Sequence, residues 1–210
     1  GPYVSAIDMS FFDQCVKPVL LEVYARPQYR GKLFGLYVIQ GYINHMSGMN
    51  HGEFGTSTLR NAMSAILAVN PDFLVFFEWN EQNENTMFQP TVYSGQTVGR
   101  LVKWYSDTLN GRSPSVYGDD DRSIPNITLS HRVVFKPGEK LRFEVLNIPD
   151  GDTAVHEVRL SLKDENGRTL VEFPTERMPA GRLGSVTYAV PGEAFAVGSS
   201  AVPFGVVSAQ

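Results

Sequence analysis

The pattern of hydrophobic residues changes near residue 112, and this change constrains the fold more than any other feature of the sequence. Before it, short apolar runs alternate with amphipathic stretches of helical spacing. After it, short segments alternate apolar and polar residues and are separated by turn residues, which is typical of antiparallel β-structure. We therefore expect two domains, 1–111 and 124–210, joined by a linker over 112–123.

Two continuous apolar runs in the first domain, 33–39 and 73–77, have the length of strands buried on both faces of a parallel sheet. Amphipathic helices are expected over 11–24, after Thr56 or Ser57, and over 98–109. Pro18 indicates a kink or a later start for the first of them.

Strands that alternate with helices are typical of an α/β fold with a parallel sheet. Only about three such units are present, whereas a complete (β/α)₈ barrel needs roughly 250 residues. We expect the C-terminal part of a (β/α)₈ TIM barrel, with a small open sheet as the alternative.

The second domain is predicted to be a β-sandwich. Strands are expected over 141–145, 158–162 and 186–190, and turns such as Pro191-Gly192 separate segments of this kind. The acidic run 119–121 in the linker is interpreted as a solvated turn, with a calcium site as the alternative.

Composition excludes several classes of function. A formal net charge of -4 disfavours nucleic acid as a partner, and no apolar run approaches the length of a membrane span. The single cysteine, Cys15, is expected to be a buried small hydrophobe. Gly1-Pro2 has the form of a protease-cleavage remnant, so we expect the natural N-terminus to lie upstream. The lack of a signal peptide is therefore uninformative.

The second apolar run ends in a loop with three glutamates, Glu78, Glu81 and Glu84. In parallel α/β folds the reactive groups lie at the carboxyl ends of strands. Glu81 and Glu84 are three residues apart in a turning loop, and paired carboxylates are what glycosidic cleavage requires. The alternative is a polar loop whose glutamates are solvated.

The residues Trp79, Asn80, Glu81, Glu84 and Thr86 form the pattern Trp-Asn-Glu-x-x-Glu-x-Thr after an apolar strand. This pattern resembles the Tyr/Trp-Asn-Glu-Trp-x-Glu-Gly-Thr signature of the GH99-like glycoside hydrolases, which include endo-mannosidases, endo-mannanases and WbsX-like proteins. The resemblance spans roughly 34–111 and does not include the β-rich domain.

The resemblance implies a role for each glutamate. Glu81 matches the residue that assists attack by the sugar's own 2-hydroxyl, and Glu84 matches the general acid/base. The implied reaction is retaining hydrolysis through an anhydro-sugar. Gln82 replaces the family's Trp and Asn85 replaces its Gly. A rival interpretation, the Asn-Glu pair of the large retaining β-glycosidase clan, fits less well because only one helix separates Glu81 from the β-rich domain.

The loop after the first apolar run supplies further candidates for substrate binding. Hydrogen bonds to sugar hydroxyls are expected from this group, which joins Trp79 and Asn80 in the predicted site: Tyr42, Asn44, His45, His51 and Glu53. The two histidines and the glutamate match no zinc spacing, so no metal and no other cofactor is expected.

We therefore predict a glycoside hydrolase that acts on a polysaccharide or glycan. The alternative is a non-catalytic carbohydrate-binding or cell-surface protein. A truncated barrel would expose sheet edges, so association with a missing barrel portion or self-association is also expected. The family resemblance favours a secreted or periplasmic bacterial protein.

Overall fold

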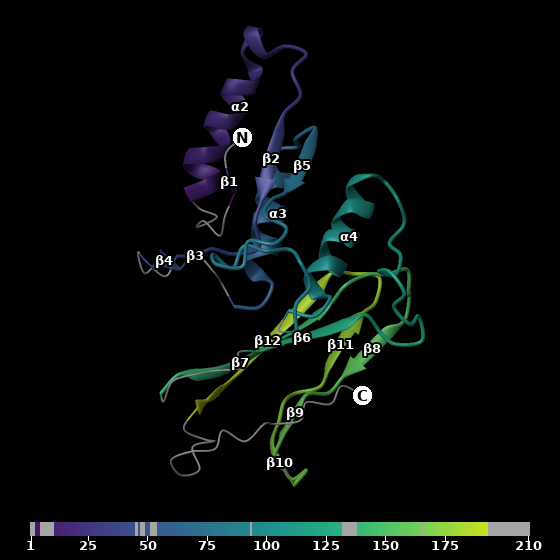
Figure 1. Ribbon diagram of the computed structural model, residues 1–210. Coiled ribbons are helices and arrows are strands. Elements are labelled where there is room, and N and C mark those ends of the chain that lie inside the picture. Colours follow the sequence, from purple (N-terminus) through teal and green to yellow (C-terminus); the bar gives the residue numbers. More distant parts are fainter. Residues whose placement is uncertain are drawn as a thin grey trace. The chain divides into compact units, whose positions relative to one another are not determined.

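The computed structural model describes residues 3–4, 11–44, 46, 49–50, 54–92, 94–131, 138–164 and 166–192 (Figure 1). The chain divides into two compact units, Gly1–Val98 and Gly99–Gln210. The sequence predicted a linker over 112–123 between two domains.

The first unit contains a three-stranded parallel sheet in the order β1-β2-β5. β1 is Tyr3–Val4, β2 is Gly35–Val38 and β5 is Phe73–Phe76. The apolar runs thus form parallel strands as predicted, with Gly35 opposite Phe73 and Val38 opposite Phe76. β2 is central and buries Leu36 and Val38 completely.

The strand β5 lies at the edge of this sheet, and its side chains are only partly buried. Its continuous apolar run predicted burial on both faces, which is therefore wrong for this strand. The first residue, Phe73, is half exposed because no described strand pairs with the outer side of β5.

Helices follow the predicted positions closely. A π-helix, Phe12–Val16, precedes α2, Lys17–Ala25. Pro18 lies in the first turn of α2, where its missing N–H is tolerated, and the helical backbone already begins in the π-helix before it. The helix α3, Ser57–Leu67, packs on β2 and β1 with Leu59, Met63 and Ile66 buried.

Cys15 is exposed, so its predicted burial is wrong. The π-helical stretch turns Phe12 into the core instead. Two further short elements are described in this unit. A 3₁₀-helix, Pro27–Tyr29, follows α2, and a two-stranded antiparallel ribbon is formed by β3, Ile43–Asn44, and β4, Met49–Asn50.

The predicted C-terminal part of a TIM barrel followed by a β-sandwich is wrong. The described residues form several small separate sheets, none of them closed, and the only described parallel sheet has three strands. The length of the apolar runs identified the strands, but it carries no information on the number of strands in a sheet. The chain after α4, Thr97–Leu109, enters antiparallel sheets and adds no further parallel strand to the described part.

The second unit holds most of α4, Thr97–Leu109, and three small antiparallel sheets. One sheet has the order β12-β7-β6, and the other two are the pairs β11-β8 and β10-β9. Their bounds are β6 Ile127–His131, β7 Lys140–Asn147, β8 Val155–Val158, β9 Ser161–Lys163, β10 Thr169–Glu172, β11 Glu176–Pro179 and β12 Gly184–Pro191.

The three sheets share one core. Phe143 of β7, Leu162 of β9 and Met178 of β11 belong to the same buried cluster. The strand predicted over 158–162 is divided into β8 and β9. Pro174 lies in the facing segment between β10 and β11, and it has no backbone N–H with which to continue the ladder.

The segment predicted as a linker, 112–123, is attached to α4 by side chains. Arg100 makes a bidentate contact with Asp120, at 2.7 and 3.0 Å. Asp107 is buried and pairs with Lys103 and Arg112. These contacts fix the segment against the helix, so it belongs to the second compact unit.

Asn147 ties the end of β7 to the turn between β11 and β12. Its side-chain amide donates to the carbonyl oxygens of Pro179, Ala180 and Arg182, at 3.2, 3.1 and 2.8 Å. Asn147 is 1% exposed, and its bond to Ala180 O is buried, while the other two bonds are partly buried.

Candidate active site

The candidate site lies where β2 and β5 end, at the carboxyl edge of the parallel sheet. The chain remains beside β2 for one residue after β5, because Phe77 N–H donates to Val38 O over 3.0 Å. It turns away at Glu78, whose φ of 70° lies in the left-handed region. This conformation is strained for a glutamate, and it starts the loop that carries Glu81 and Glu84.

The loop is packed against the sheet by an aromatic contact. Phe88 is 3% exposed, and its ring meets Phe76 of β5 edge-on with centroids 5.5 Å apart. The loop also closes on itself, because Gln89 N–H donates to Trp79 O over 2.8 Å. Its backbone path is therefore fixed although the loop contains no helix or strand.

Contacts from the end of β2 hold the loop on its other side. The side-chain amide of Gln40 donates to Met87 O. A Cβ at Gly41 would lie 3.6 Å from Asn85 O, so Gly41 and the loop are in close proximity. The end of β2 therefore holds the loop through a side chain and through close backbone packing.

A hydrogen bond joins the two predicted site regions. Tyr42 Oη donates to Glu84 Oε1 over 3.4 Å, although the two residues are 42 positions apart in the sequence. Thr86 is 1% exposed, and its hydroxyl donates to Glu81 O over 3.3 Å. The structure thus brings Tyr42 and Glu84 together and ties Glu81 to the same turn.

The electrostatic character of the loop is acidic. Glu78, Glu81 and Glu84 are all partly buried. In the described part of the chain no lysine or arginine forms an ion pair with any of the three. The carboxylate of Glu84 instead accepts the hydrogen bond from Tyr42.

The structure describes the other predicted binding residues to different extents. Trp79 is 61% exposed and Asn80 is exposed, so both present their side chains to solvent at the site. Asn44 lies in β3, where only the backbone is described. His45, His51 and Glu53 lie outside the described residues.

Asn85 replaces the glycine of the resembled signature, and the backbone conformation at this position explains why an asparagine fits there. Its φ is 54°, in the left-handed region where glycine is most at ease and asparagine is the best tolerated of the other residues. An asparagine therefore supports the same backbone conformation that a glycine would adopt here. Asn85 N–H donates to Gln82 O over 3.3 Å and closes the turn between the two glutamates.

A metal-binding cluster and a membrane-spanning helix are both absent from the described residues. No group of three or more histidine, cysteine, aspartate or glutamate side chains in this part of the chain is arranged to hold a metal ion. Within the same residues, no helix has the length and hydropathy needed to cross a membrane.

Comparison with known proteins adds no relative. No family model, no curated protein and no solved structure matches this chain.

Proposed function

We propose that this chain is a glycoside hydrolase that acts on a polysaccharide or glycan, with its reaction centre at the ends of β2 and β5. Glu84 is the general acid/base, and Glu81 assists the nucleophile. Trp79 supplies a face on which a sugar ring stacks, and Asn80 supplies hydrogen bonds to its hydroxyls.

The proposed reaction has two steps. In the first, the Glu81 carboxylate takes the proton of the sugar 2-hydroxyl, whose oxygen attacks the anomeric carbon while Glu84 protonates the leaving oxygen. The glycosidic bond breaks and an anhydro-sugar forms. In the second, Glu84 takes a proton from water, the water oxygen attacks the anomeric carbon, and the proton on Glu81 returns to the 2-oxygen. Configuration is retained because each step inverts the anomeric carbon.

The observation that carries the proposal is the contact between Tyr42 and Glu84. It joins the end of β2 to the loop after β5, and a carboxyl held by a neighbouring hydroxyl is oriented for proton transfer. The anchoring of the loop by Gln40 and Phe88 supports the same interpretation, because catalytic groups must be held within a fraction of an ångström.

A second candidate function is carbohydrate binding without cleavage. The exposed indole of Trp79 favours it, since an exposed aromatic face suffices for stacking on a sugar. Gln82 replaces a second tryptophan of the resembled signature, so the aromatic surface available for stacking on a sugar is smaller here.

The two functions are separated by measuring binding and cleavage on one panel of α-mannans and other polysaccharides. Release of reducing ends by the wild-type chain supports the hydrolase. Retention on a glycan without release, lost in Trp79→Ala, supports the binding protein. If the chain neither cuts nor binds any glycan in the panel, both proposals are wrong.

A further inference from the structure

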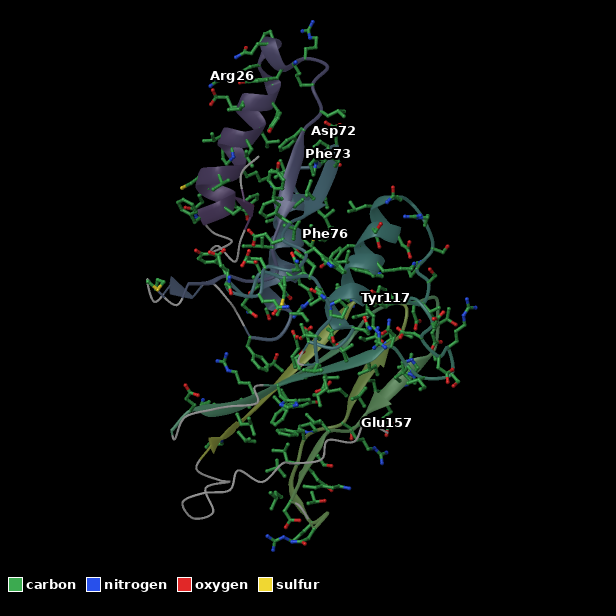
Figure 2. The ribbon with its side chains drawn as sticks, in the orientation of Figure 1. Arg26, Asp72, Phe73, Phe76, Tyr117 and Glu157 are labelled. Carbon is green, nitrogen blue, oxygen red and sulfur yellow. The ribbon has the colours of Figure 1, made fainter. Side chains whose placement is uncertain are left out.

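The strongest feature outside the candidate site is the loop between α2 and β2, residues 26–33, which we call the tip. It lies at the amino-terminal edge of the parallel sheet, since β2 begins at Gly35 directly after it. The candidate site lies at the opposite, carboxyl-terminal edge. Figure 2 labels Arg26 at the start of the tip and Phe73 at the start of β5.

The tip is basic in an acidic chain. All eight residues are exposed, and they include three cations, Arg26, Arg30 and Lys32, with no carboxylate. The chain as a whole has a net charge of -4. Arg26 pairs with Glu22 at 2.8 Å, but no described carboxylate pairs with Arg30 or Lys32.

The tip also exposes apolar side chains beside these cations. Leu33 is 76% exposed and Tyr29 is 39% exposed. Phe73, at the same edge of the sheet, is 47% exposed. Isolated exposed apolar residues are ordinary, but here they gather at one edge with unpaired cations.

The backbone of the tip is fixed before any partner binds. Tyr29 N–H donates to Arg26 O and Lys32 N–H donates to Tyr29 O, at 3.0 and 2.9 Å. At its base, Phe34 N–H donates to Asp72 Oδ2 over 2.7 Å, and the ring of Phe34 stacks on Tyr24. A preorganised loop loses little conformational entropy on binding.

We propose that the tip docks the chain on an anionic lipid surface, with Arg30 and Lys32 at the headgroups and Leu33 and Tyr29 in the interfacial layer. Basic side chains are attracted by acidic headgroups, and apolar side chains beside them gain by leaving water. An acidic protein fits less well, because the eight residues of the tip are fewer than the roughly 20–30 residues that each partner contributes to a stable interface. A lipid surface needs no such matched area.

The test is co-sedimentation of the whole chain with vesicles of phosphatidylcholine mixed with phosphatidylserine, and with vesicles of phosphatidylcholine alone. We expect binding to the mixed vesicles only. Arg30→Gln combined with Lys32→Gln lowers the partition coefficient by about 25-fold, at about fivefold for each cation. Leu33→Ser lowers it by about tenfold.

The matched control is Arg122→Gln combined with Arg177→Gln, which removes the same charge from two exposed positions of the second unit and leaves binding unchanged. Circular dichroism verifies that all variants are folded. The proposal is overturned if the wild type ignores the mixed vesicles, or if the tip and control double variants bind equally. It is also overturned if Leu33→Ser retains full binding, because the apolar side chain that the proposal places in the interfacial layer would then contribute nothing.

Discussion

The stability of the loop that carries Glu81 and Glu84 depends on Phe88. This side chain is nearly fully buried and packs edge-on against Phe76. Truncation of a buried phenylalanine to alanine costs about 3–5 kcal/mol through lost burial and the remaining cavity. Because a loop can partly collapse into that cavity, we expect Phe88→Ala to lower the free energy of unfolding of the first unit by about 3 kcal/mol.

The assay is urea unfolding followed by the fluorescence of Trp79. The chain has two tryptophans, so a Trp104→Phe background confines the signal to the first unit. Val92→Ala is the control, since Val92 lies in the same loop and is 94% exposed; its effect should stay within about 0.5 kcal/mol. Equal midpoints for the Phe88 and Val92 variants would refute the argument that Phe88 anchors the loop.

Three further predictions concern the scaffold. Asn147→Ala should destabilise the second unit by about 1–3 kcal/mol, because the buried carbonyl of Ala180 and the partly buried carbonyls of Pro179 and Arg182 lose their donor. Asn147→Asp should be worse at pH 7; thermal unfolding checks this, and a tolerated aspartate would contradict it. The pKa of Asp107 is lowered chiefly by its hydrogen bond from Lys103. The stability that this carboxylate gives the fold is therefore complete above the pKa of the unfolded state, about 3.9, and is lost as the pH falls through the lower pKa of the folded state. Unfolding midpoints of wild type and Asp107→Asn should therefore converge from pH 7 to pH 3, and a constant difference would exclude the linkage. Gly35→Ala places a Cβ against the ring of Phe73 and should cost about 1–3 kcal/mol, a loss that disappears in a Phe73→Ala background if the clash is its cause.

The positions of the strands were predictable because apolar runs and turn residues are local signals. The runs over 33–39 and 73–77 become β2 and β5, paired in parallel. The number of strands was not predictable, since the edge position of β5 depends on which segment lies beside it and not on its own residues. The division of the strand over 158–162 was missed for a similar reason, because Pro174 in the facing segment interrupts the ladder.

The candidate site was predicted in part. The residue pattern identified the loop with Glu81 and Glu84, because carboxylates after an apolar strand are a local signal. The contact between Tyr42 and Glu84, and the bond from Gln40 to Met87 O, depend on how two distant segments meet and have no signature in the sequence. The left-handed conformation of Asn85 had a weak signal, since asparagine tolerates it better than most residues do.

The central claim is that Glu84 donates a proton and Glu81 activates the nucleophile. The most direct measurement is kcat/KM of the wild type, Glu81→Gln and Glu84→Gln on a cleaved glycan and on the matching glycosyl fluoride, with Glu172→Gln as an exposed control. We expect both site variants to lose about 10²–10⁴ in kcat/KM on the glycan. On the fluoride, whose leaving group needs no proton, Glu84→Gln should lose far less while Glu81→Gln remains impaired. Variants that cut the glycan as fast as the Glu172 control would contradict the account.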